Sequence, residues 1–115
     1  MSEGDPDLET VAGLLEDRTV RTILTETSKE PMSATELKGQ CGASGPTIYR
    51  RLERLREADL VVEATRPDPD AGHHRTVYEP NLERVTIELA DGALSVRIER
   101  REEMADRFTR LVEEM

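Results

Sequence analysis

The chain has 115 residues, a formal net charge of −9, and charged and hydrophobic fractions of 36% each. This length suits one domain with a modest core and excludes a two-domain enzyme. No apolar run reaches the roughly 18–20 residues of a membrane span, no signal-peptide pattern opens the chain, and a single cysteine excludes an intrachain disulfide. We therefore expect a cytoplasmic protein with no membrane contact.

The basic residues are unusual in kind, because 14 are Arg and only Lys29 and Lys38 are Lys. Abundant carboxylates with scarce lysine keep a protein hydrated and soluble at high salt, and so large a net charge otherwise destabilises a small fold by self-repulsion. The composition therefore favours a salt-adapted protein. An acidic protein from a GC-rich genome, which also favours Arg, is the alternative.

The first third of the chain predicts helices. Residues 1–7 are acidic and interrupted by Gly and Pro, which predicts a disordered tail. Helical spacing of apolar residues then runs from Leu8 to about Lys29, and Gly13 with the charged run 16–18 is a point at which this segment could divide into two helices. Pro31 ends it, because the residue before Pro avoids the helical region.

Two short helices follow. Ser33 and Glu36 form a capping-box pattern that starts a helix over 34–41. Gly42 suits a left-handed turn residue and Ser44 suits the N-cap of a second helix over 44–58. Two helices joined by a short turn containing Gly are typical of a helix-turn-helix.

Two hairpins are predicted next. Strands over 60–66 and 75–79 flank a loop of turn-forming residues at 67–72. In the second hairpin, apolar residues alternate over 85–89 and 94–98 around Asp91-Gly92, which favours a two-residue type I′ turn. That turn places all six apolar side chains on one face and Arg84 opposite Glu99.

A helix from about residue 100 ends the chain. Its apolar residues form one stripe, which exceeds what a chain end needs, and the first helix offers a matching stripe. We expect a homodimer whose interface contains Leu8, Val11, Leu15, Met104, Phe108, Leu111 and Met115. The alternative is packing of the last helix on the second hairpin of its own chain. The element order predicts a small α+β domain.

Positive charge is concentrated on the helix over 44–58, which carries four Arg within residues 50–56. Thr47, Arg50, Arg51 and Arg54 are spaced to lie on one face, opposite the apolar Ile48, Leu52 and Leu55. A helix that enters the DNA major groove needs this arrangement. A solvated surface helix is the alternative for any charged helix face.

These residues resemble a known family. The stretch ATELKGQCGASGPTIYRRLERLREADLV, followed by PDPDAGHHRTVYEP, resembles the helix-turn-helix and wing of ArsR-like winged helix-turn-helix transcription regulators. The stretch LADGALSVRIERREEMADRFTRL resembles regulators of halophilic archaea that add a hairpin and a terminal helix, so the resemblance covers about residues 8–115. It implies a DNA-binding winged helix over 8–80, with 81–115 as the dimerisation element. The residues that it places on DNA or on the wing are Ser44, Thr47, Tyr49, Arg50, Arg51, Arg54, Arg66, His73, His74 and Arg75.

Other chemistry is not expected. The metal-sensing members of that group use paired cysteines or a His-containing terminal helix, whereas Cys41 stands alone here, so we expect no metal and no cofactor. A thiol at this helix position is expected to be buried, with a raised pKa and little reactivity, although a redox role stays open. Neighbouring His73 and His74 on a strand point to opposite faces, which hinders joint chelation.

No catalytic motif is present, so we do not expect an enzyme. The predicted function is sequence-specific binding of duplex DNA at a pseudo-palindromic operator. The alternative is a winged-helix adaptor that binds protein in a transcription complex.

Overall fold

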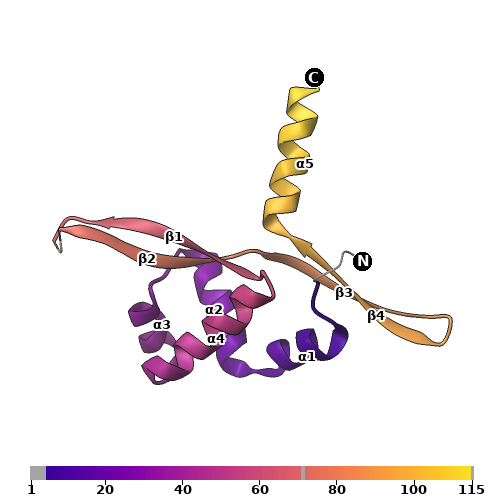
Figure 1. Ribbon diagram of the computed structural model, residues 1–115, viewed down its shortest axis with the longest axis horizontal. Helices are drawn as coiled ribbons and strands as arrows, with labels where there is room; N and C mark the ends of the chain where they lie inside the picture. Colours follow the sequence, from indigo (N-terminus) through magenta and orange to yellow (C-terminus); the bar gives the residue numbers. More distant parts are fainter. Residues whose placement is uncertain (1–4, 71, 115) are drawn as a thin grey trace.

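The computed structural model describes residues 5–70 and 72–114 and confirms the α+β class. A helical body carries two β-hairpins, which project in opposite directions, and the C-terminal helix stands away from both (Figure 1). The elements in chain order are α1 (Leu8–Glu16), α2 (Arg18–Lys29), α3 (Ala34–Cys41), α4 (Gly45–Glu57), β1 (Val61–Asp68), β2 (His73–Pro80), β3 (Leu82–Ala90), β4 (Ala93–Arg100) and α5 (Arg101–Glu113). None of the described helices is long and apolar enough to cross a membrane.

The first helical segment divides in two at Asp17. This residue is the C-cap of α1 and the N-cap of α2, where its carboxylate accepts a hydrogen bond from the Val20 amide at 3.1 Å. An extended residue at this point turns the chain so that both helices bury apolar side chains in one core. Residues 1–4 of the predicted tail lie outside the described residues, and Asp7 is ordered as the N-cap of α1.

The helix-turn-helix forms as predicted. Ser33 and Glu36 make both hydrogen bonds of the capping box, and Gly42 ends α3 in the left-handed region with φ of 61°. Ser44 then caps α4 by accepting a hydrogen bond from the Thr47 amide. The inner faces of the two helices meet α2 in the core through four side chains that are at most 2% exposed, namely Leu37, Ile48, Leu52 and Leu55.

The β1–β2 hairpin is longer than the sequence predicted. Its ladder runs from Val61 opposite Pro80 to Asp68 opposite His73, so Pro67 lies in a strand rather than in the loop. A Pro is tolerated there because both strands of a two-stranded sheet are edge strands, and an edge leaves amides unpaired. At its base the hairpin is joined to the segment before α3 by two backbone hydrogen bonds between Met32 and Tyr78.

The β3–β4 hairpin has the predicted register. Val85 pairs with Ile98, and Arg84 pairs with Glu99, whose carboxylate lies 2.7 Å from the guanidinium. The turn residues Asp91 and Gly92 both have positive φ, as a type I′ turn requires. The apolar face is covered only near its root, where α1 packs beneath β4. Its outer residues remain exposed, namely Ile87, Leu89 and Leu94.

Helix α5 does not pack on the hairpin of its own chain. Each α5 side chain that the structure describes is exposed, including Met104, Phe108 and Leu111 of the predicted stripe, and the helix rises away from the body (Figure 1). Met115 lies outside the described residues. The apolar stripe of α5 is therefore without a partner in the described part of the monomer.

Candidate nucleic-acid interface

The first turns of α4 present a chain of polar side chains. Ser44 donates its hydroxyl hydrogen to the Thr47 Oγ1 at 3.0 Å, and Arg50 reaches the same oxygen with Nη2 at 3.4 Å. Ser44 and Arg50 are exposed and Thr47 is half-buried, whereas Ile48 on the opposite side of the helix is fully buried. This arrangement gives the N-terminal half of α4 a face of hydrogen-bonding groups directed to solvent.

Arg51 points away from this face. Its Nε lies 2.6 Å from Oδ2 of Asp17, and both side chains are mostly buried. Partial burial raises the pKa of Asp17, but the Val20 amide and the Arg51 guanidinium outweigh it, so the pKa lies below the ordinary 3.8. Arg51 thus joins α4 to the junction of α1 and α2, and its guanidinium is directed to Asp17 rather than to the face formed by Thr47 and Arg50.

The remaining arginines of α4 lie on its flanks. Arg56 is 3.0 Å from the Glu63 carboxylate on β1, and the guanidinium of Arg54 lies over Gly13 of α1. Among the described residues, Arg50 and Arg54 are the arginines of α4 that no carboxylate contacts. The cluster of four arginines therefore divides into two that lie beside carboxylates and two that contact none among the described residues.

The wing, which the β1–β2 hairpin forms, also contains arginines with different contacts. Arg66 of β1 donates from Nη2 to Oε1 of Glu36 and also reaches the Pro31 carbonyl, so it ties the wing to the start of α3. Partial burial raises the pKa of Glu36, but the hydrogen bonds from Arg66 and from the Ser33 amide outweigh it, so the pKa lies below the ordinary 4.5. Arg66 thus contacts Glu36 while its side chain remains 41% exposed.

The outer part of the wing is more accessible. Arg75 lies 3.3 Å from Asp68 across the hairpin, and His74 is exposed. The backbone of His73 is part of β2, while its side chain lies outside the described part of the structure. Among the predicted wing residues with described side chains, His74 is exposed, and Arg66 and Arg75 are 41% and 44% exposed, each beside a carboxylate.

A hollow of about 260 Å³ lies between α3, α4 and the wing. Its walls carry hydroxyls from Thr35, Tyr49 and Thr76, and the side chains of His74 and Arg75. The Tyr49 side chain is 60% exposed at the rim. A site with many donors and one permanent cation suits a phosphate oxygen better than an apolar group. The hollow joins the exposed face of α4 to the outer wing.

Cys41 occupies the position expected of a structural thiol. It is half-buried against the core, and burial raises its pKa above the ordinary 9.0, with a further increase from the charge of Glu26. A protonated thiol is a poor nucleophile and a poor metal ligand.

Two buried polar residues were not predicted as functional. Asn81 is 3% exposed and Arg100 is 5% exposed, at the junction of the two hairpins and α5. A signal for Arg100 was present in the sequence, because it continues the inward alternation of Leu94, Val96 and Ile98. Such an inward arginine must find buried acceptors.

Comparison with known proteins agrees with this fold. Residues 15–64 match the family model described as a helix-turn-helix domain. No curated protein gives a significant match to the chain. The matched segment runs from the end of α1 into β1, and the wing completes it. The fold and the match together define a winged helix-turn-helix domain, which is a class of DNA-binding module.

Proposed function

We propose that this protein is a sequence-specific transcriptional regulator of the ArsR-like winged helix-turn-helix group. The observation that best supports this proposal is the Ser44–Thr47–Arg50 face on α4, which is directed to solvent and lies opposite the buried Ile48. A helix with donors on one face and core residues on the other fits the major groove, and an arginine there donates two hydrogen bonds to guanine. In this proposal α4 reads bases.

The wing holds the DNA backbone in the same proposal. His74, Arg75 and the hydroxyl-lined hollow beside Tyr49 lie next to the exposed face of α4. Phosphate contacts fix the position and register of a protein on DNA without reading sequence. Arg66 contributes indirectly, because its bond to Glu36 fixes the wing against α3.

The regulator acts as a homodimer. The exposed apolar stripe of α5 supports this, because Phe108 is 69% exposed and Leu111 is 62% exposed. Val11, by contrast, is 1% exposed in the core of its own chain, and Leu8 and Leu15 are half-buried against that core. The dimer interface that we propose therefore contains only residues of α5. Two-fold symmetry then places two α4 helices over the halves of a pseudo-palindrome.

The protein works at high salt and comes from a halophilic archaeon in this proposal. The support is compositional, since 25 acidic residues and only two lysines occur in 115 residues. Surface carboxylates bind water and keep the chain soluble and monodisperse where salt screens charge.

Selection of binding sites from a random duplex library in molar KCl tests the function. We expect one enriched motif with two inverted half-sites, and protection of that motif in footprinting. Arg50→Ala should reduce the enrichment strongly, whereas Arg110→Ala, on α5 but outside its apolar stripe, should retain it. If the folded parent enriches no sequence, direct DNA readout is refuted and a protein-binding adaptor becomes the better explanation.

A further inference from the structure

A buried arginine caps the C-terminus of the proposed recognition helix. Arg100 donates from Nη2 to the Ala58 carbonyl at 2.9 Å and from Nε to the Asp59 carbonyl at 3.0 Å. Its remaining nitrogen, Nη1, lies 3.0 Å from the Asp5 carboxylate, and the side chain is 7% exposed. The last carbonyls of a helix carry partial negative charge, so a guanidinium is well suited to this position.

The backbone at this helix end needs such a partner. Asp59 has φ of 58°, a left-handed conformation that ends α4 and turns its carbonyl outward. The same carbonyl accepts a second hydrogen bond, from Asn81 Nδ2 at 3.0 Å. The end of α4 is thus fixed by side chains from outside the helix-turn-helix.

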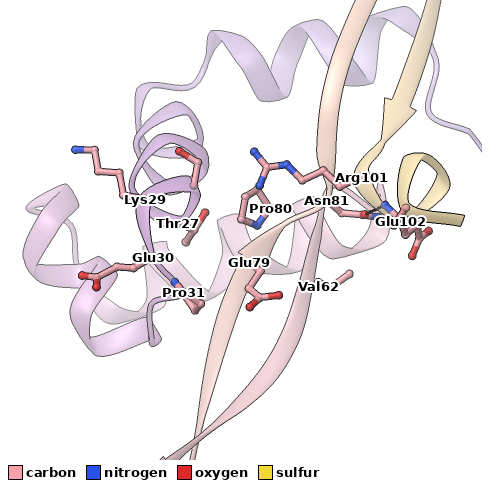
Figure 2. Close-up of a pocket in the computed structure, with 12 residues that line it drawn as sticks. Thr27, Lys29, Glu30, Pro31, Val62, Glu79, Pro80, Asn81, Arg101 and Glu102 are labelled. Carbon is pink, nitrogen blue, oxygen red and sulfur yellow. Dashed lines mark hydrogen bonds between the residues drawn. The ribbon is translucent and has the colours of Figure 1, made fainter. Parts of the chain in front are cut away.

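Asn81 connects the same helix end to α5. Its backbone amide donates to the Leu60 carbonyl at 2.8 Å, and its backbone carbonyl accepts from the Arg101 amide at 2.7 Å. Its Oδ1 accepts from the Glu102 amide at 3.2 Å, which satisfies a free donor in the first turn of α5. Figure 2 shows Asn81 beside Arg101 and Glu102 at this point.

Beyond these hydrogen bonds, the described residues give α5 one exposed ion pair with the body, between Arg101 and Glu83 of β3 at 3.6 Å. A hollow of about 500 Å³ lies between the end of α2 at Thr27–Lys29 and the root of α5 at Arg101 and Ala105, so the two helices do not pack together there (Figure 2). The described side chains of α5 are all exposed. Its direction therefore depends on its root.

We infer that Arg100 and Asn81 form a rigid joint that sets the angle between α4 and α5. The inference rests on the proposed function, in which α4 reads DNA and α5 carries the dimer contact. In that dimer the angle determines how far apart the two α4 helices lie, and with which rotation. Arg100 and Asn81 are then positioning residues that determine the half-site spacing of the operator, although neither touches DNA.

The joint is tested first without DNA. Spin labels at Glu53→Cys on α4 and Glu113→Cys on α5, in a Cys41→Ala background, report the distance between the helices. We expect a narrow distribution in the parent and a clearly broader one in Arg100→Met. Arg97→Met is the matched control, because Arg97 is an exposed arginine of the same strand, β4, and takes no part in the joint. Arg100→Lys, which keeps the charge, replaces Arg100→Met if that variant fails to fold.

The second measurement uses operators whose spacer is varied one base pair at a time. Each step moves a half-site by about 3.4 Å and rotates it by about one tenth of a turn, so a rigid dimer should prefer one spacer by about 10-fold or more. Arg100→Met should reduce that preference to about 2-fold, with the same half-site sequence. A loss of stability alone would lower binding to all spacers equally.

The outcomes separate the joint from the proposed function. A broader distance distribution with a flattened spacer preference supports the joint. An unchanged distribution, or an unchanged preference in a folded Arg100→Met dimer, overturns it. If the parent binds none of the operators, the proposed function fails, and the spin-label distances alone decide whether the joint exists.

Discussion

The Nε of Arg51 lies 2.6 Å from the Oδ2 of Asp17, and this contact joins α4 to the turn between α1 and α2. Arg50, the preceding residue, is exposed and bonds only to Thr47 within its own helix. Adjacent residues on a helix differ by about 100° in direction, which is enough to turn one arginine to the core and the other to solvent. Two neighbouring arginines therefore lie in different surroundings.

Arg50→Ala and Arg51→Ala should separate DNA binding from stability. Arg51→Ala is expected to lower the free energy of unfolding by about 1–2 kcal/mol, because it leaves the half-buried Asp17 without its cation. Arg50→Ala should change stability by less than about 0.5 kcal/mol but weaken specific operator binding by about 1–3 kcal/mol. Urea unfolding and operator titrations measure both. Equal effects of the two changes on stability and on binding would contradict this assignment.

The Asp17 carboxylate should make stability depend on pH. Because its pKa in the folded state lies below the ordinary 3.8, its charge stabilises the fold at every pH above that value. The contribution disappears as the pH falls below about 4, because protonation then favours the unfolded chain. Asp17→Asn keeps an N-cap residue but removes the charge. Urea unfolding from pH 6 to pH 3 should show a smaller loss of stability in Asp17→Asn than in the parent, and equal losses would exclude this role.

Local signals predicted most of the fold. The β3–β4 register followed from a two-residue turn that agreed with the apolar alternation, and the Ser33–Glu36 capping box located the start of α3. Each of these signals involves residues that are close together in the sequence, so the sequence alone shows it. Agreement between independent local signals is why these elements were correct.

The candidate site was harder to predict, because it depends on contacts between distant residues. Helical spacing placed Arg51 with Arg50 and Arg54, but it could not show that Asp17, from another helix, lies beside it. In the same way, the sequence could not show that the wing residue Arg66 lies beside Glu36 of α3. An acidic chain supplies many such partners, so arginine counts overestimate the charge left for DNA.

The α5 stripe predicts a dimer that one charge should disrupt. Phe108→Glu places a carboxylate in the middle of the exposed apolar surface, where pairing would bury it without a partner. We expect a folded monomer with weak operator binding. Thr109→Glu is the matched control, because it adds the same charge to an exposed position about 100° around the helix. Light scattering in molar KCl measures the mass, and a monomeric parent would rule out the interface.

Positive charge that is concentrated on α4 in an otherwise acidic chain should also change how operator affinity responds to salt. An ordinary DNA-binding protein loses affinity steeply as salt rises, because binding releases counterions from the phosphates. In the proposed complex, the carboxylates around α4 and the wing would also lie in the negative field of DNA. At about 0.1 M salt that repulsion acts over about 10 Å, whereas at 1 M the screening length is about 3 Å and only close contacts such as that of Arg50 remain.

We therefore expect operator affinity to hold steady or improve between about 0.5 and 2 M KCl, a range in which an ordinary regulator would lose orders of magnitude. Cations taken up between protein carboxylates and phosphates would add to this effect by offsetting the usual release.

Titration of labelled operator at several KCl concentrations measures the slope, and circular dichroism at each concentration verifies that the protein is folded. Replacing one exposed acid on α4 and one on the wing, Glu53→Gln with Asp70→Asn, should restore part of the ordinary negative slope, because fewer carboxylates then oppose the DNA. A steep loss of affinity in the folded parent would show that the acidic residues serve solubility alone.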